Sequence, residues 1–400
     1  MENKYYERNV SVFLYYRFFN NMLIIGPVLM LFLLWKGLNY TNIMVLQSIS
    51  AISVLVFEVP TGIVSDKITR HLALFLGSLL CFLGLLLYIL GKQFIIFAGA
   101  EIVFGLGITF TSGSDTSLLY ESLVKLGRKK EYQTILGKSM SIMFIGQGIG
   151  AVISSLLYKI NPLIPFIISL GFLLVAMLSS AFFYDRGREK STGNYLLHAL
   201  HSAREIITKK RILWAICFAV VIGIVNRCSF WFYQPYFQEV KLDVIWYGAA
   251  FLFFNLTAAF SSHYLVKRFQ DVRPRRLLLV LLFAMGVSFF LPALHPAIYM
   301  IPVFAIQQFV RGLYQPTMSF YINHQVQDHN RATVSSMVSM AACLGFACFS
   351  PIAGRWLDTI GTIPAYFRMS WLAWSGFVLL FIFWRLHKKA KKSINAPEME

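Results

Sequence analysis

The segment Glu58-Val-Pro-Thr-Gly-Ile-Val-Ser-Asp-Lys-Ile-Thr-Arg-His71 is a short charged stretch between two long apolar runs. Neither residues 40–57 nor residues 72–90 contain Asp, Glu, Lys or Arg. Each run is long enough to cross a bilayer as a helix. The segment between them is therefore expected to turn in water or among lipid headgroups, and its charges mark one face of a membrane.

The composition of the whole chain supports a membrane protein. The 400 residues are 57% hydrophobic, 16% aromatic and only 14% charged, which excludes an ordinary soluble domain. The net charge of +18 does not indicate nucleic-acid binding, because the basic residues lie in short connections between apolar spans and not on one folded face. We expect neither a cofactor nor a metal site. All five cysteines fall inside apolar runs without C-x-x-C spacing, so they are predicted to be packing residues and not disulfides or metal ligands: Cys81, Cys217, Cys228, Cys343 and Cys348.

The apolar stretches predict an all-α integral membrane protein with twelve transmembrane helices. Each stretch is roughly 20–28 residues, which covers a hydrocarbon core of about 30 Å with some tilt. We place the spans near residues 11–35, 40–65, 72–91, 93–120, 138–158, 162–184, 212–237, 244–266, 275–294, 297–322, 331–356 and 363–385. A long basic segment divides the chain almost in half, so we expect an N-terminal six-helix bundle (residues 1–184), a linker (185–211), a C-terminal six-helix bundle (212–386) and a tail (387–400).

The distribution of basic residues predicts the orientation in the membrane. With these spans, 27 of the 36 Lys and Arg residues fall on the side that holds both termini. The positive-inside rule therefore places both termini and the linker in the cytoplasm, and we expect a bacterial inner (plasma) membrane. The opposite side has only Lys36, Lys92, Lys159 and Lys241, and five arginines lie within spans or at their ends: Arg17, Arg227, Arg311, Arg355 and Arg368.

The charged segment also contains a motif. Its spacing Gly62-x-x-x-Asp66-Lys67-x-x-Arg70-His71 resembles G-x-x-x-D-R/K-x-G-R-R/K, the signature between the second and third helices of the major facilitator superfamily. The match departs at Thr69, where the family usually has glycine. The resemblance implies two pseudo-symmetric six-helix bundles that rock about a central cavity. It also implies a gating role for Gly62, Asp66, Lys67 and Arg70.

The physical role we expect for this motif is a latch. Asp66 can face the positive N-terminal end of a helix in the other bundle, and Arg70 can pair with an acid or with carbonyl groups at a helix end. Each contact contributes about 0.3–2 kcal/mol, enough to bias two conformations of nearly equal free energy. The alternative is that these are ordinary positive-inside charges, with the aspartate as N-cap of the third helix. The second half has a basic turn at residues 267–276, but the glycine and aspartate of the motif are missing at the equivalent positions, which hold Ser262 or His263 and Val266.

The fourth span carries acidic residues at membrane depth. Glu101 lies four residues before Gly105, where many proton-coupled members of the superfamily have an arginine. An ionised acid in a membrane costs a few kcal/mol unless it pairs or reaches water, so Glu101 and Asp115 are candidate proton-coupling residues. The alternative places Glu101 at the outer headgroup level, and Asp115 with Glu121 at the cytoplasmic interface.

In the superfamily the first, fourth, seventh and tenth spans line the cavity, and the polar residues of this chain fall on those spans. Gln307, Arg311 and Gln315 recur every four residues and so share one helix face. Three cavity arginines favour an anionic or zwitterionic solute. The alternative is that the arginines at 227 and 311 pair with the acids of the fourth span and hold the bundles together. The candidate cavity residues are Arg17, Glu101, Asp115, Arg227, Gln307, Arg311 and Gln315.

These features predict a monomeric secondary transporter that moves a small organic solute by alternating access with proton coupling. We expect no catalytic residues. The solute is expected to be an anionic or amphipathic metabolite, a siderophore or a drug-like compound, with membrane lipid as the other partner. The sequence contains no Walker A motif, so we do not expect direct use of ATP. Two alternatives stay open: a membrane-embedded enzyme, and a transport-dead receptor or lipid scramblase with the same fold.

Overall fold

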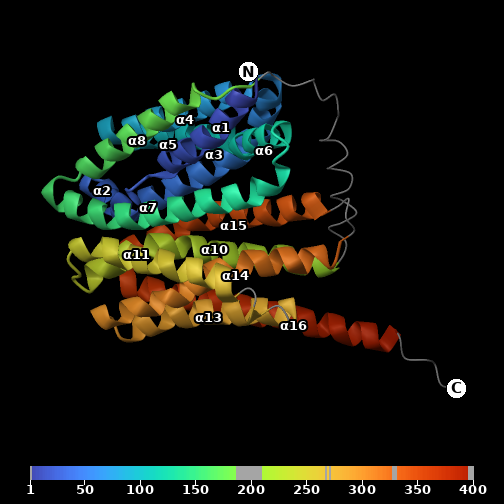
Figure 1. Cartoon of the computed structure of the whole chain (residues 1–400). Coiled ribbons are helices and arrows are strands. Elements are labelled where there is room, and N and C mark those ends of the chain that lie inside the picture. Colours follow the sequence, from blue (N-terminus) through green and yellow to red (C-terminus); the bar gives the residue numbers. More distant parts are fainter. Residues whose placement is uncertain (1, 186–209, 266–267, 270–271, 327–330, 395–400) are drawn as a thin grey trace. The chain divides into compact units, whose positions relative to one another are not determined.

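The computed structural model describes residues 2–185, 210–265, 268–269, 272–326 and 331–394. These residues form helices and connecting turns and include no β-strand (Figure 1). Nine helical segments of the described chain are long and apolar enough to cross a membrane. The all-α membrane fold predicted from the composition is therefore confirmed for this part of the chain.

Three of the twelve predicted spans do not meet the same criterion of length and apolarity. Helices α8 (Ile164–Ser180) and α11 (Ile245–Phe260) are apolar but shorter than a full crossing. Helix α14 (Ala305–Asn323) is not among the apolar helices, because the polar residues of the predicted cavity stripe interrupt its hydrophobic sequence. The helices occur along the chain in the order of the predicted spans. By length and apolarity alone, nine of the described helices qualify as membrane crossings.

The described residues fall into two compact units. Unit 1 holds the residues up to 185 together with Leu242–Leu252, which include the first half of α11. Its core joins α1, α4 and α6 through Phe13, Tyr16, Leu74 and Leu118. The remaining elements of unit 1 are α1 (Glu2–Asn21), η1 (Gly26–Val28), α2 (Leu29–Trp35), α3 (Tyr40–Lys67), α4 (Arg70–Leu90), α5 (Phe94–Thr111), α6 (Ser114–Lys125), η2 (Lys129–Glu131) and α7 (Tyr132–Ile160).

Unit 2 holds residues 210–241 and the described residues from 253 onward. An aromatic cluster fills its interior, where the rings of Tyr236 and Phe304 lie 5.1 Å apart and those of Phe289 and Tyr366 lie 5.3 Å apart. The predicted division at residues 185–211 stays a prediction, because residues 186–209 lie outside the described chain. The further elements of unit 2 are α10 (Lys210–Glu239), η3 (Ser261–Leu265), α13 (Pro274–Leu294), η4 (Ile298–Phe304), α15 (Arg331–Thr359) and α16 (Thr362–Ile394).

The turn between the second and third predicted spans is shorter than the sequence predicts. Helix α3 continues through Pro60 to Lys67, and α4 begins at Arg70. Pro60 removes one backbone donor from the helix without ending it, and the hydroxyl of the following Thr61 donates to the carbonyl of Phe57 at 2.7 Å. The N-cap of α4 is Thr69, so the alternative of an aspartate cap is wrong.

Two predicted spans are broken into separate helices. The fourth span divides between α5 and α6, because Gly113 has a φ of +77°, a left-handed conformation that ends α5 and that glycine adopts without strain. The first span divides between α1 and α2 around Gly26 and Pro27, a pair that interrupts regular helix. The break at Gly113 places the buried side chain of Ser114 inside unit 1.

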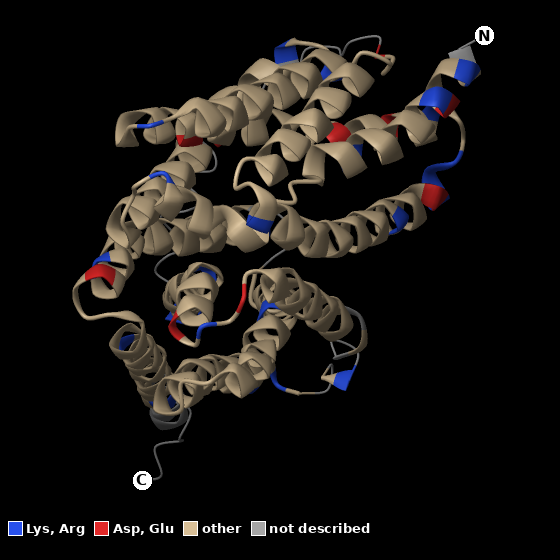
Figure 2. Ribbon diagram, turned by 90° about the vertical axis from the view of Figure 1, so that its left-hand side faces the viewer, with Lys and Arg blue, Asp and Glu red and all other residues tan. Residues whose placement is uncertain are grey.

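Charged residues lie mostly at helix ends and in connecting segments (Figure 2). One exposed pair joins the end of α7 to the turn before α11: Lys159 Nζ donates to Asp243 Oδ2 at 2.8 Å. Asp243 Oδ1 also accepts from the backbone N–H of Ile245 at 3.0 Å. The bond from Lys159, followed by that from Ile245, lowers the pKa of Asp243 below its usual value.

This lowered pKa predicts an acid-sensitive contact. Asp243 is bound as a carboxylate, so its contribution to stability is present above the pKa that it has in the unfolded chain and is lost as the pH falls through the lowered pKa of the folded state. We expect the Asp243→Asn variant to unfold at a slightly lower temperature than the wild type at pH 7, with a difference that shrinks below about pH 4. Thermal unfolding in detergent across pH checks this, and a difference that grows in acid would contradict it.

Candidate functional site

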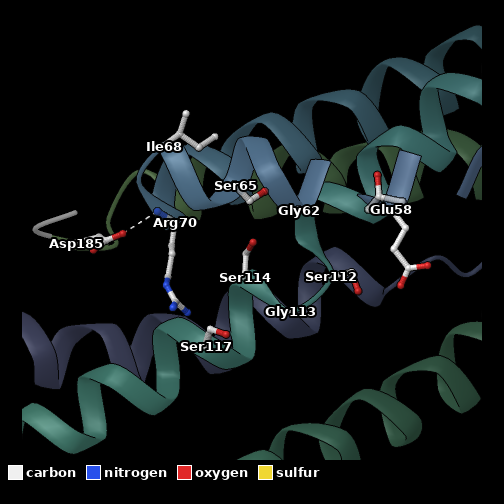
Figure 3. Close-up of a pocket in the computed structure, with 11 residues that line it drawn as sticks. Glu58, Gly62, Ser65, Ile68, Arg70, Ser112, Gly113, Ser114, Ser117 and Asp185 are labelled. Atoms are coloured by element: carbon white, nitrogen blue, oxygen red, sulfur yellow. Dashed lines mark hydrogen bonds between the residues drawn. The ribbon is translucent and has the colours of Figure 1, made fainter. Parts of the chain in front are cut away.

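Arg70 is the first residue of α4, directly after the turn that follows α3, and it is only 7% exposed. Its backbone N–H donates to Asp185 Oδ2 at 2.7 Å (Figure 3). Its guanidinium Nη2 donates to Glu121 Oε1 at 2.6 Å. These contacts tie the first residue of α4 to α6 and to the segment that follows α8. Within unit 1 the motif arginine is therefore held by two carboxylates.

A polar pocket of about 240 Å³ lies beside Arg70. Its walls come from the end of α3, the break between α5 and α6, and Asp185, and Figure 3 shows Glu58 at the end of the pocket away from Arg70. A Cβ atom at Gly62 would meet nothing within 4 Å, so no close approach requires glycine there in this conformation. Lys67 is exposed, and the side chain of Asp66 lies outside the described structure. The gating role of these motif residues stays a prediction.

Arg17 of α1 and Asp115 of α6 form an ion pair, with Nη1 and Oδ2 3.6 Å apart. Their side chains are 13% and 17% exposed. The distance is longer than a hydrogen bond, and Arg17 Nε and Nη1 have no hydrogen-bond partner among the described residues. Asp115 lies in the first turn of α6, where a negative charge is stabilised, and its Oδ1 accepts from the backbone N–H of Thr116 at 2.6 Å. The structure thus brings two predicted cavity residues together in a loose, mostly buried pair.

Polar side chains extend from this pair along α1. The hydroxyl groups of Tyr16 and Ser78 are hydrogen-bonded at 3.0 Å, and Ser78 Oγ donates to Asn20 Oδ1 at 3.0 Å. Gln147 Nε2 of α7 donates to the carbonyl of Asn21 at 2.9 Å. The polar face of α1 is therefore connected to α4 and α7, which fixes the helix that carries Arg17.

Glu101 of α5 is buried at 6% exposure and lies in a separate cluster. Its Oε1 accepts a short hydrogen bond from the hydroxyl of Tyr88 in α4 and a bond from Gln47 Nε2 of α3 at 3.2 Å. Among the described residues no basic side chain forms an ion pair with it. Glu101 thus connects three helices of unit 1 through neutral donors.

In unit 2 the residues of the predicted polar stripe on α14 differ in their burial. Gln307 is 1% exposed, and within the described chain neither its Oε1 nor its Nε2 has a hydrogen-bond partner. Arg311 and Gln315 are exposed. Arg311 Nη1 donates to Gln308 Oε1 at 3.4 Å, and Gln308 Nε2 donates to the hydroxyl of Tyr233 in α10 at 2.9 Å. Gln308, and not Gln307, therefore connects the arginine to α10.

Arg227 of α10 is also exposed, and its described contacts in unit 2 are with neutral groups. Its Nη1 donates to Cys343 Sγ at 3.7 Å, and its guanidinium lies 5.7 Å from the centre of the Phe346 ring. Neither Arg227 nor Arg311 forms an ion pair with a carboxylate of the described residues of unit 2. Both arginines are therefore exposed and bound by neutral groups within the described part of unit 2.

Several residues of these clusters are missing from the sequence prediction. Tyr88 and Gln47, the partners of Glu101, lie on neighbouring spans and carry no local pattern that separates them from other polar residues. Asp185, the partner of the Arg70 backbone, does have a simple signal, because it is the first acid after the sixth span. Among the described residues no group of three or more His, Cys, Asp or Glu could hold a metal ion.

The fold resembles solved transporters. The nucleoside transporter NupG aligns over 96% of this chain and 99% of its own, with a TM-score of 0.78 and 12% identity. A bacterial homologue of the human lysosomal transporter Spinster, inward-facing and unoccupied, aligns over 95% of each chain with a TM-score of 0.69 and 15% identity. A POT family transporter in complex with 5-aminolevulinic acid aligns over 94% of this chain and 96% of its own, with a TM-score of 0.69 and 12% identity. These likenesses concern the fold.

The sequence itself assigns the family. No curated protein matches the chain. A family model described as the Major Facilitator Superfamily matches residues 10–348, from the first predicted span into the eleventh. This match confirms the resemblance seen in the motif at the end of α3 and the start of α4. The chain belongs to the major facilitator superfamily and is a membrane transporter, not an enzyme.

Proposed function

We propose that this transporter moves a small organic anion by alternating access and that protonation of Asp115 drives the movement. The observation that carries the proposal is the Arg17–Asp115 pair, which is mostly buried and separated by 3.6 Å. A proton on Asp115 removes the attraction between the two side chains and leaves Arg17 with an uncompensated charge. Helix α1 and the break before α6 then have a different preferred arrangement, which links proton binding to conformation.

The proposed solute class rests on unit 2. Arg227 and Arg311 are exposed cations without carboxylate partners in the described part of that unit, and a charge-assisted hydrogen bond to an anion is among the strongest polar contacts. Gln307 adds a buried amide whose polar atoms have no partner in the described chain, which costs about 1–3 kcal/mol until a ligand or a rearrangement satisfies it. An anionic metabolite, a siderophore or an anionic drug-like compound fits these groups, and amphipathic solutes fit the aromatic residues beside them.

The two arginines give a direct prediction about affinity. For an anionic solute, we expect Arg311→Gln and Arg227→Gln each to weaken binding by roughly tenfold or more, because each removes a charged hydrogen bond of about 1.5–3 kcal/mol. The exposed Arg368, which lies over the ring of Trp356, provides the matched control, and Arg368→Gln is expected to bind normally. Solute titrations of the purified proteins measure the effect. Unchanged affinity in both variants would remove the anion site.

The remaining parts of the proposal concern gating and orientation. We place Gly62, Asp66, Lys67 and Arg70 at a gate on the cytoplasmic side, where Arg70 exchanges its carboxylate partners as the conformation changes. Both chain termini are proposed to be cytoplasmic, and the protein to be a monomer in a bacterial inner membrane. Cysteine accessibility in whole cells tests the orientation, because a reagent that cannot cross the membrane should label position 159 and not position 129 in a chain without other cysteines.

A flux experiment tests the function as a whole. Anionic solutes are first screened by thermal shift with purified full-length protein, since a ligand that binds the folded state raises its unfolding temperature. The solutes that bind are then supplied to proteoliposomes with and without an imposed pH gradient. We expect uptake that the gradient stimulates and that a proton-conducting ionophore abolishes. Solute uptake that is independent of the gradient would remove proton coupling, and binding without uptake would favour a receptor.

A further inference from the structure

A second pocket lies in unit 2, beside the turn that precedes α13. It has a volume of about 290 Å³, and its walls are the first turn of α13, the last turns of α14 and the preceding turn. The lining includes Phe269, Leu277, Leu313, Pro316 and Phe320. Thr317 supplies the one side-chain hydroxyl of the lining, and it donates to the carbonyl of Leu313 at 2.7 Å. The side chains of the lining are therefore mostly apolar and suit a hydrocarbon group.

The rim of this pocket is strongly basic. The sequence of residues 266–276 contains five Lys or Arg and one acid, of which Lys267 and Asp271 lie outside the described structure. Arg268, Arg273 and Arg276 are each adjacent in sequence to a pocket residue, and all three are exposed. Among the described residues none of these three arginines forms an ion pair. Their charge is therefore available to an anion above the apolar pocket.

Arg275, in the same turn, differs from these three arginines. Its Nε donates to the hydroxyl of Tyr321 at 2.9 Å, and its guanidinium lies 5.1 Å from the centre of the Trp214 ring. The side chain is half-buried and holds α13 against α10 and α14. Arg275 thus has a structural role, whereas no such side-chain contact is found for the other three arginines within the described part of the chain.

We propose that this pocket binds an anionic phospholipid of the surrounding membrane, with part of an acyl chain between α13 and α14 and the phosphate at Arg273 and Arg276. Helix α13 is a membrane-spanning candidate, so its first turn lies where the hydrocarbon core meets the headgroups. Basic residues at that boundary attract anionic lipid, and the N–H groups of a first helical turn favour a phosphate. The volume is at the lower end for ligand pockets, which fits a segment of chain and not a whole lipid.

The apolar walls and the arginines together favour an anionic phospholipid over other ligands. A soluble phosphate compound would use the arginines but would gain nothing from the apolar walls. A neutral phospholipid would use the walls but would gain little from three cations. An anionic phospholipid buries hydrocarbon and neutralises charge in one binding event. The site is independent of the transported solute, so its test does not depend on the proposed transport function.

The experiment uses purified full-length protein in detergent. It is titrated separately with dioleoyl phosphatidylglycerol, dioleoyl phosphatidylcholine and glycerol 3-phosphate, and bound lipid is counted by native mass spectrometry while thermal unfolding is followed in parallel. We expect phosphatidylglycerol to bind and to raise the unfolding temperature more than the other two compounds. At about 1 kcal/mol for each arginine near anionic headgroups, Arg273→Gln should weaken its binding about fivefold and the Arg273→Gln/Arg276→Gln double variant about 25-fold.

Two further variants separate the charge from the pocket. Thr317→Phe fills the pocket without changing the charge and should also weaken phosphatidylglycerol binding. Arg355→Gln removes one exposed arginine near the end of α15 and should bind as the wild type does. Equal binding of the two phospholipids to the wild type, or an equal temperature shift with glycerol 3-phosphate, would overturn the proposal without any variant. Normal phosphatidylglycerol binding by a folded Thr317→Phe protein would also overturn it.

Discussion

Replacing Asp115 with asparagine is expected to abolish solute accumulation driven by a proton gradient while solute exchange continues. Asparagine cannot take up a proton, so movement of solute is no longer tied to movement of protons. For one proton per solute, each unit of pH gradient supplies about 1.4 kcal/mol and supports up to about tenfold accumulation. We therefore expect the wild type to approach tenfold accumulation per unit of pH gradient and the variant to reach equal concentrations on both sides.

The measurement is solute uptake into proteoliposomes at several imposed pH gradients, with exchange of labelled solute at equal pH as the test of folding. The asparagine side chain still offers an oxygen to the N–H of Thr116, but Arg17 loses its counter-ion and the fold loses stability. The double variant Arg17→Gln/Asp115→Asn removes both charges and is expected to recover that stability but not the coupling. Glu131→Gln is the control, because it changes a half-exposed carboxylate that pairs with Arg128. We expect this variant to retain solute accumulation driven by the proton gradient.

Glu101→Gln decides between the two acids of the fourth span. The carboxylate of Glu101 accepts bonds from Tyr88 and Gln47, which are neutral donors to which an amide oxygen can also bind. We assign coupling to Asp115, so the Glu101→Gln protein should still accumulate solute. If gradient-driven accumulation disappears in this variant and survives in Asp115→Asn, the coupling acid is Glu101 and the assignment to Asp115 is wrong.

The Gly107→Ala variant is expected to be substantially less stable than the Gly99→Ala variant, although both glycines lie in α5. A Cβ atom at Gly107 would approach the carbonyl oxygen of Gly77 to 2.7 Å and the backbone nitrogen of Cys81 to 2.8 Å. These are backbone atoms of α4, so the clash is relieved only if the helices separate. Overpacking of this kind costs about 1–3 kcal/mol. A Cβ atom at Gly99 would meet nothing within 4 Å.

The comparison between these two variants cancels the general effect of replacing glycine in a helix. Alanine is the better helix former by about 1 kcal/mol at both positions, so the difference between the variants reports the close contact of α4 and α5. Thermal unfolding in detergent measures it, with a lower midpoint expected for Gly107→Ala. If Gly107→Ala unfolds at or above the temperature of Gly99→Ala, the two helices do not approach each other as closely as described.

Hydrophobic length predicts where a span lies in the sequence, but it does not predict whether the span is broken into two helices. Hydrophobic length located the fourth span, and glycine and serine at residues 112–114 were visible in it, but a single glycine does not separate a continuous helix from two helices. The tertiary packing of α6 against α1 and α4 favours the break and places Asp115 beside Arg17. The sequence therefore predicted the two residues as candidates but not their contact.

The partners of the buried charges were the least predictable part. Arg70 was expected to pair with an acid or with carbonyl groups at a helix end, and the sequence does not say which acid that is. Glu121 lies 51 residues from Arg70 and Asp185 lies 115 residues from it, so only the folded arrangement of α4, α6 and α8 selects them. Periodicity placed Gln307 and Arg311 on one face of α14, but burial of the glutamine depends on the neighbouring helices.

The sequence by itself determined that this chain is a helical membrane transporter. Long uncharged runs cannot remain in water, their backbone groups must pair within helices, and the motif after the second span is specific enough to indicate the family. Only the tertiary structure decided which polar groups meet, because residues far apart in the chain become neighbours through packing. It paired Arg17 with Asp115 and enclosed Glu101 among neutral donors. It gave Arg227 and Arg311 neutral partners within the described part of unit 2, since burial gives each polar group the partners that packing provides.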